Sequence, residues 1–294
     1  MKSTNKMDDF CAFILTHGRA DRVLTYNTLR GQGYTGKIYI VIDDEDSQAD
    51  AYRERYGDEV LQFCKVDVAK TFDEGDNFKD RRAIVYARNA CWGLAEQVGC
   101  KYFIQLDDDY TTFNHTLDVE NVYLTKRPKV RNLNAIFASM VDFSQVSPKI
   151  ATIAFSQGGD FIGGEGSNVA KKMLSRKAMN SFVCSIEKPF KFSGRLNEDV
   201  NTYTTLGSRG ALFLSSNNVA LGQLATQSNE GGITEFYKKF GTYVKAFQTV
   251  VFQPSSVIIS TIGNTKETQR IHHKIKWKHT VPKIIREDIK HGQR

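Results

Sequence analysis

The sequence has no long hydrophobic run, and this absence excludes a membrane-spanning protein. None of the 294 residues lies in an apolar stretch near the ~18 residues of a transmembrane helix. The N-terminal segment MKSTNKMDDF also has no apolar signal core. We therefore expect a cytoplasmic protein with no membrane partner. With only 5 prolines and 40% hydrophobic residues, the composition also excludes a collagen-like or disordered chain.

Two common kinds of ligand motif are missing as well. The 5 cysteines are scattered and include no CxxC pair, which disfavours disulfides and a zinc site and favours buried free thiols. The first predicted strand is not followed by GxGxxG, and GxxxxGK[ST] is absent, so neither a dinucleotide fingerprint nor a P-loop is indicated. A nucleotide would have to be held by other groups.

Net positive charge is scarce outside the C-terminal end of the chain. Residues 266–294 hold nine basic and three acidic residues, which accounts for +6 of the net charge of +7. We predict a nearly neutral domain over residues 1–265 and a basic extension over residues 266–294. Such an extension favours an anionic partner, although a solubilising tail has the same composition.

Apolar runs alternate with helical patterns in the first 110 residues. Strands are expected at residues 10–16, 37–42, 60–66 and 102–106, and the longest helix at residues 80–98. Apolar strands separated by helices predict an α/β fold whose parallel sheet is covered on both faces. The second half is less regular, with helices expected at 132–143 and 234–247 and strands at 150–155, 211–214 and 257–262.

Polar clusters follow three of the first four predicted strands. They are Thr16-His17-Gly18-Arg19, Asp43-Asp44 and Asp107-Asp108-Asp109. Ligands of parallel sheets bind at the carboxyl ends of the strands. Asp107 and Asp109, two positions apart, can face one Mg²⁺ or Mn²⁺ ion while a diphosphate supplies further oxygens. A solvated acidic turn is the alternative, but three adjacent carboxylates repel one another without a cation.

These features together resemble the GT-A fold of nucleotide-sugar-dependent glycosyltransferases. The resemblance implies a Rossmann-like, mixed but mainly parallel sheet with helices on both faces, a UDP-sugar or similar donor, and a bound Mn²⁺ or Mg²⁺ ion. It implies that the donor is bound by Thr16, His17, Arg19, Asp43, Asp44, Arg88, Asn89 and Asp108. It implies that the metal is held by Asp107 and Asp109 together with a histidine near the C-terminus, for which His272, His273 and His279 are the candidates.

The segment Asn197-Glu198-Asp199 resembles the xED segment of the same family. In inverting members its carboxylate is the catalytic base, so Glu198 and Asp199 are the candidate catalytic residues. If the reaction retains the anomeric configuration, this carboxylate has another role. Asp199 could also only cap the helix that follows.

Four segments resemble a narrower group, the TET/JBP-associated GT-A enzymes and their phage relatives. These segments are THGRADRVLTYNTL, YIVIDDED, YARNACWGLA and FIQLDDDY. The resemblance implies sugar transfer to hydroxymethylated pyrimidines in DNA by a phage-encoded protein in the host cytoplasm. DNA phosphates and bases would then be contacted by Lys126, Arg127, Lys129 and Arg131 and, in the extension, by Lys274, Lys276, Trp277 and Lys278.

Three alternatives stay open from the sequence. The acceptor could be a protein, lipid or polysaccharide, in which case truncation of the extension should leave transfer intact. Acidic strand ends could also hold the paired cations of a phosphodiesterase or nuclease, which would leave Arg88-Asn89 unexplained. A catalytically silent nucleic-acid-binding module would tolerate the loss of Asp107 and Asp109.

Overall fold

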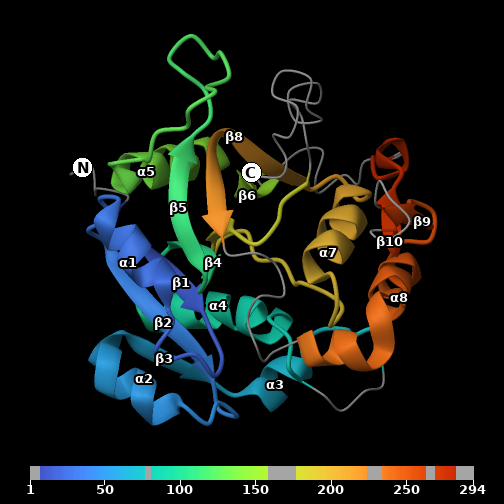
Figure 1. Ribbon diagram of the computed structural model, residues 1–294, viewed down its shortest axis with the longest axis horizontal. Coiled ribbons are helices and arrows are strands. Elements are labelled where there is room, and N and C mark those ends of the chain that lie inside the picture. The colour runs from blue at the N-terminus through green and yellow to red at the C-terminus, as the bar shows by residue number, and fades with distance from the viewer. Residues whose placement is uncertain (1–6, 77–80, 158–176, 224–233, 263–268, 283–294) are drawn as a thin grey trace.

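A mixed eight-stranded sheet forms the centre of the computed structural model, which describes residues 7–76, 81–157, 177–223, 234–262 and 269–282 (Figure 1). The strands lie in the order β3 (Val60–Phe63), β2 (Lys37–Asp43), β1 (Phe10–Leu15), β4 (Tyr102–Asp107), β7 (Phe182–Ser185), β6 (Ile150–Gln157), β8 (Leu212–Gln223) and β5 (Tyr110–His115). The first four strands in this order are parallel, and β6 is parallel to β8. β7 and β5 are antiparallel to their neighbours.

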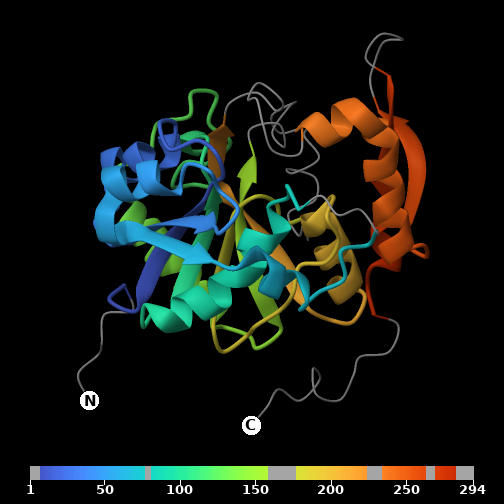
Figure 2. The same cartoon turned by 90° about the horizontal axis from the view of Figure 1, so that it is seen from below.

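Helices cover both faces of this sheet (Figure 2). One face packs against α1 (Leu24–Gly31), α2 (Ala49–Tyr56) and α5 (Leu133–Ser144). The other packs against α3 (Lys65–Ala69), α4 (Val85–Gln97) and α7 (Glu198–Gly207). The predicted α/β fold, with a mixed and mainly parallel sheet between two helical layers, is therefore confirmed.

The sequence of β1 explains why both faces are covered. All six residues of FCAFIL are buried. Phe10, Ala12 and Ile14 point into one hydrophobic cluster, and the alternate residues Cys11 and Phe13 point into the other. Because successive side chains of a strand point to opposite faces, a strand that is apolar at every position needs a helix on each side.

The register of the parallel strands brings their polar ends together. Leu15 of β1 pairs with Val41 of β2 and with Asp107 of β4. Thr16, Asp43 and Asp107 consequently leave the sheet at nearly the same level. This is the sheet edge at which the sequence predicts a ligand.

Some predicted bounds are wrong at strand and helix ends. The strand predicted at residues 60–66 ends at Phe63, because α3 begins at Lys65, whose backbone N–H donates to the Asp44 carboxylate at 2.8 Å. The helix predicted from residue 80 begins at Val85. The short strands β5 and β7 lacked the continuous apolar runs of the parallel strands and were not predicted.

Part of the basic extension packs on the body of the protein. α8 (Thr234–Phe252) contacts a two-stranded antiparallel ribbon of β9 (Val257–Ile262) and β10 (Arg270–Ile275). A one-turn 3-10 helix, Trp277–His279, follows β10. Residues 283–294 of the predicted extension lie outside the described residues. In the part of the chain that the structure describes, no helix is long and apolar enough to cross a membrane.

Candidate active site

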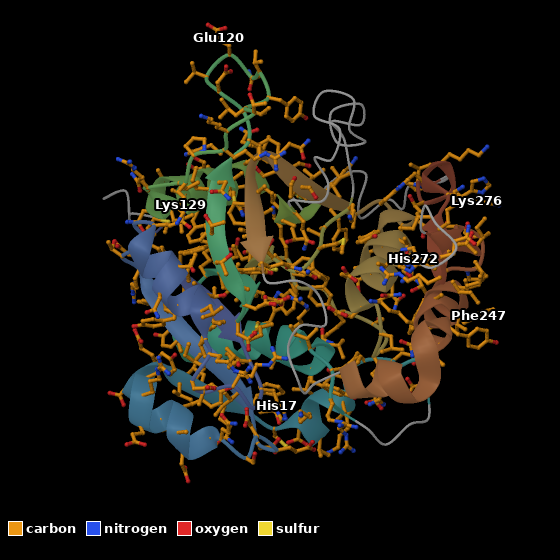
Figure 3. All side chains as sticks on the ribbon, viewed as in Figure 1. His17, Glu120, Lys129, Phe247, His272 and Lys276 are labelled. Atoms are coloured by element: carbon orange, nitrogen blue, oxygen red, sulfur yellow. The ribbon has the colours of Figure 1, made fainter. Side chains whose placement is uncertain are left out.

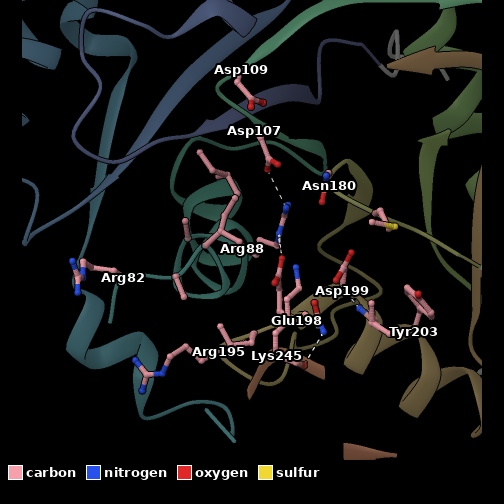
Figure 4. Close-up of a pocket in the computed structure, with 18 of the residues that line it drawn as sticks. Arg82, Arg88, Asp107, Asp109, Asn180, Arg195, Glu198, Asp199, Tyr203 and Lys245 are labelled. Atoms are coloured by element: carbon pink, nitrogen blue, oxygen red, sulfur yellow. Dashed lines mark hydrogen bonds and ion pairs between the residues drawn. The ribbon is translucent and has the colours of Figure 1, made fainter. Parts of the chain in front are cut away.

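A cavity of about 800 Å³ lies at the carboxyl ends of β1, β2 and β4 and extends to α7, α8 and β10 (Figure 4). It is lined by eight basic side chains and six acidic ones. The basic ones are Arg19, Lys65, Arg82, Arg88, Lys177, Arg195, Lys245 and Lys274, and the acidic ones are Asp43, Asp107, Asp108, Asp109, Glu198 and Asp199. This balance fits an anionic ligand that also brings a cation.

The turn that carries the three aspartates is fixed by α1. The Thr25 hydroxyl donates to the backbone oxygen of Asp107 at 2.6 Å and accepts from the Tyr110 N–H at 2.9 Å. The backbone N–H of Thr25 donates to the backbone oxygen of Asp108 at 3.1 Å. These bonds hold the chain in a tight turn between β4 and β5. Asp107 and Asp109 are thereby directed into the cavity, as Figure 4 shows.

Asp108 connects this turn to the loop after β1. Its carboxylate accepts from the Thr16 hydroxyl at 2.6 Å and from the Arg19 guanidinium at 3.1 Å. Thr16 also lies 2.9 Å from the Tyr52 hydroxyl. Thr16, Arg19 and Asp108, which the sequence predicts to bind the donor, all line the cavity. Asp108 is 4% exposed, so it acts chiefly by holding the Arg19 side chain at the cavity wall.

Asp43 and His17 form a second pair at the same edge. The His17 Nδ1 lies 2.8 Å from an Asp43 oxygen, and the Lys65 ammonium lies 2.8 Å from the other. The hydrogen bond to Asp43 raises the pKa of His17. Burial favours the protonated Asp43, but His17 and Lys65 outweigh it and lower the pKa of Asp43. Asp44 does not line the cavity, because its carboxylate binds the start of α3.

Arg88 connects the two ends of the cavity. It is fully buried, and its Nη2 and Nε donate to Asp107 and Glu198, each at 3.0 Å (Figure 4). Its Nη1 makes no hydrogen bond to any described residue, and neither does the Nε of Arg19. Buried donors of this kind need a partner, and a diphosphate would supply one. Asn89 points away from the cavity and exchanges hydrogen bonds with the backbone of Phe192, at 3.0 and 2.9 Å.

The two candidate catalytic carboxylates occupy different environments at the start of α7. Asn197, in the left-handed conformation at φ 53°, is anchored to α8 by bonds to the Lys245 oxygen and the Thr249 hydroxyl at 3.0 and 2.9 Å. Glu198 is bound by Arg88, whereas Asp199 accepts from the Val200 N–H at 2.8 Å. Burial and the nearby Glu198 raise the pKa of Asp199 to about 6. A carboxylate with this pKa is suited to accept a proton near neutral pH.

The electrostatics at Asp107 and Asp109 fit a divalent cation. Burial raises the pKa of Asp107 to about 7, since the repulsion from Asp109, Glu198 and Asp108 adds to burial and Arg88 offsets only part of it. Burial and Asp108 also raise the pKa of Asp109. At neutral pH the Asp107 carboxylate is therefore only partly ionised unless a cation is bound, and the hard oxygen donors of Asp107 and Asp109 suit Mg²⁺ or Mn²⁺.

The predicted metal ligands do not form one group. Within the described ranges, no three His, Cys, Asp or Glu side chains are gathered so as to hold a metal ion. His272 and His273 line the cavity from β10, where the Nδ1 of His273 lies 3.3 Å from the Asn197 amide. The two histidines thus belong to β10, where His273 contacts the start of α7, whereas Asp107 and Asp109 belong to the end of β4 and the turn that follows it.

The predicted DNA contacts fall into two sets. Lys126, Arg127, Lys129 and Arg131 follow β5, which runs away from the cavity, and none of them lines it (Figure 1). The six residues of β5 give this strand a length of ~20 Å, at ~3.4 Å per residue. Figure 3 shows Glu120 at the tip of the loop after β5 and Lys129 nearer its base.

The second set lies on β10 and just after it. Lys274 and Trp277 line the cavity, whereas Lys276 and Lys278 are exposed and do not. The Trp277 ring stacks on Tyr203 of α7, with ring centroids 5.7 Å apart and planes at 14°. One face of Trp277 is thus engaged within the protein.

Several lining residues had no signal in the sequence. Lys177 and Lys245 belong to no ligand motif, and only the fold brings them to the cavity. Arg195 lies three residues before Glu198, and its ion pairs with Glu74 and Asp76, at 3.3 and 3.2 Å, fix the loop that precedes α7.

Comparison with known proteins gives one family and distant likenesses among solved structures. A family profile described as TET-Associated Glycosyltransferase matches residues 10–232. Among curated proteins, no sequence matches this chain.

Three of the solved structures that resemble this chain illustrate the low identity. A crystal structure of a mycobacterial protein has a TM-score of 0.45 at 8% identity, covering 94% of this chain and 89% of that one. Glucosyl-3-phosphoglycerate synthase from Mycobacterium tuberculosis, in complex with Mn²⁺, UDP-glucose and phosphoglyceric acid, has a TM-score of 0.43 at 9% identity, covering 89% and 85%. Its complex with UDP gives 0.41 at 10%, covering 89% and 86%. These likenesses are distant and assign no ligand to this chain.

Proposed function

Because the chain belongs to the TET-associated glycosyltransferase family, we propose that it transfers a sugar from a UDP-sugar to the hydroxyl of a hydroxymethylated pyrimidine in DNA. Membership confirms the predicted enzyme class and family. It also disfavours the phosphodiesterase and the catalytically silent module as interpretations of the acidic strand end. The observation that carries the proposal is the Arg88 bridge, which joins the carboxylate pair of β4 to the carboxylates of α7 in one cavity.

The donor occupies the sheet side of the cavity in this proposal. Asp107 and Asp109 hold Mn²⁺ or Mg²⁺, and the metal ion offsets charge on the diphosphate leaving group when it is bound. Arg19 and Arg88 line the same region, each with a buried N–H that makes no bond to a described residue. These donors can bind diphosphate oxygens and stabilise the charge that develops as the glycosidic bond breaks.

The nucleoside lies against the ends of β1 and β2 in this arrangement. The His17–Asp43 pair supplies a hydrogen-bonding group there, kept in place by Lys65. The lowered pKa of Asp43 keeps it ionised and able to accept from a base N–H.

Asp199 is the proposed base. It lines the cavity near Glu198, and its pKa of about 6 lets it accept the proton of the acceptor hydroxyl during attack on the sugar. Glu198 is bound by Arg88 and so positions that guanidinium between the donor and acceptor sides. Asn197 holds the start of α7 on α8 and thereby sets the direction of both carboxylates.

DNA is proposed to reach the cavity from the β10 side and to extend over the protein surface. Lys276 and Lys278 are exposed next to the cavity-lining Lys274, and can contact phosphates there. Lys126 and Lys129 follow β5 and do not line the cavity, so they would contact phosphates further along the duplex.

Thermal shift with nucleotides tests the donor site. UDP with Mn²⁺ at ~100 times its dissociation constant should stabilise the protein by ~2.7 kcal/mol and raise its melting temperature by ~4 °C. UDP without Mn²⁺ should give a smaller shift, and Asp107→Asn should abolish the metal-dependent part. Asp44→Asn is the matched control, because Asp44 does not line the cavity. No metal-dependent shift with any nucleotide would refute the proposed donor.

A further inference from the structure

Three lysines from separate parts of the chain line the cavity. Lys177 precedes β7, Lys245 lies in α8 and Lys274 lies in β10, and all three line the cavity. We call these three residues the lysine wall. His272 and His273 lie beside it, with their ring centroids 4.2 Å apart. Neither histidine belongs to a metal-binding group among the described residues.

The field at this wall is positive. Burial lowers the pKa of His272, and Lys245, Arg270 and Lys177 lower it further. Burial, His272 and the same two lysines lower the pKa of His273 to about 4. Among the described residues, every charged group that shifts these two rings is cationic. The positive charge of the wall is that of its lysines.

Lys245 of the lysine wall lies on the acceptor side of the cavity. Figure 4 shows Lys245 on the side that holds Glu198 and Asp199, across Arg88 from Asp107 and Asp109. Lys245 also acts electrostatically on Asp199 and lowers its pKa in part. Figure 3 shows His272 on the inner side of the C-terminal ribbon and Lys276 on the outer side. An anion at this wall would be a neighbour of the proposed base and would not share the diphosphate site.

We infer that the lysine wall is a phosphate subsite that holds a backbone phosphate of the acceptor strand next to the nucleotide being glycosylated. The inference rests on the proposed function for the identity of the acceptor. Lysine ammonium groups bind phosphate as point charges, and hydrogen bonds to charged groups are the stronger ones. Because the subsite lies within the cavity, the acceptor nucleotide must leave its base stack to reach Asp199.

Binding of a short oligothymidylate, dT4, tests this subsite without sugar transfer. Calorimetric titration is done on the full chain with saturating UDP and Mn²⁺, so that the diphosphate side is filled. Lys245→Met and Lys177→Met should each weaken dT4 binding ~10-fold or more. Lys149→Met removes the same charge at the opposite end of β6 from the cavity-lining Gln157, and should leave binding unchanged within twofold.

Inorganic phosphate and thymidine 5′-monophosphate form further arms. Lysine-dependent binding of these small phosphates without dT4 binding would show a phosphate subsite that excludes a strand, which overturns the inferred polynucleotide acceptor. Equal weakening in Lys149→Met and Lys245→Met would show only general charge attraction and would overturn the subsite. Retention of the UDP–Mn²⁺ thermal shift shows that a variant is folded with its donor side intact.

Failure of the proposed function is visible separately from failure of the subsite. dT4 has no hydroxymethyl group, so its binding needs no transfer chemistry. Lysine-dependent dT4 binding without transfer to any hydroxymethylated DNA would contradict the function and leave the subsite standing. Transfer with unchanged dT4 binding in Lys245→Met and Lys177→Met would contradict the subsite alone.

Discussion

Replacement of Asp199 by asparagine separates the proposed base from the rest of the cavity. The change removes one proton acceptor and keeps the size of the side chain, and the amide oxygen can still accept from the Val200 N–H. General base catalysis contributes ~10² to 10⁴ in rate. Asp199→Asn should therefore lower kcat/KM for sugar transfer by that factor, while the UDP–Mn²⁺ thermal shift stays as in the unaltered protein.

The pH profile gives a second measure of the same group. With a pKa of about 6, Asp199 is mostly protonated at pH 5 and mostly ionised at pH 7. The base acts in its ionised form, so kcat/KM should rise with pH, by ~10-fold between these two values, and level off above them. Saturating Mn²⁺ in the assay keeps Asp107 ionised, so that its own pKa of about 7 does not shape the curve.

Asp44→Asn is the matched control for this experiment. It makes the same chemical change at the same sheet edge, but its side chain binds the start of α3 and does not line the cavity. Its rate and pH profile should match those of the unaltered enzyme. The assignment is refuted if Asp199→Asn retains more than a tenth of the rate, or if the rise near pH 6 persists in that variant.

Two further predictions concern the contacts that hold the cavity together. Arg88→Met leaves the carboxylates of Asp107 and Glu198 without their buried partner, so the free energy of unfolding should fall by ~3 to 5 kcal/mol in urea denaturation; a loss below ~1 kcal/mol would contradict the bridge. Trp277→Ala removes the stacking on Tyr203 and should lower that free energy by ~1 to 3 kcal/mol, whereas a side chain used only for DNA would weaken binding without loss of stability.

The sheet and one side of the cavity could be predicted from the sequence because their signals are local. The apolar run of β1 and the aspartates that end β4 are contiguous in the chain, and the register of parallel strands does the rest. Asp107 and Asp109 accordingly line the cavity, at the sheet edge where the sequence predicts a ligand. Their ligand roles stay predictions.

The other side of the cavity could not be predicted, because distant segments form it. Lys245 lies on a helix with no motif around it, and its place depends on how α8 packs against α7. Asn89 follows Arg88 directly, yet the helix turns it by about 100° around the axis, and its amide holds the Phe192 backbone. The net charge of the tail likewise did not reveal that Lys274 faces the cavity while Lys276 does not.

The most direct test of sugar transfer is the mass of the product nucleosides. DNA containing hydroxymethylcytosine is incubated with the full chain, Mn²⁺ and each of several UDP-sugars, then digested and analysed by mass spectrometry. The account predicts hydroxymethylcytosine heavier by one sugar residue with at least one donor, and no such product with Asp107→Asn or without the donor. Unmodified nucleosides with every donor and with hydroxymethyluracil DNA as well, in a protein that binds UDP with Mn²⁺, would contradict it.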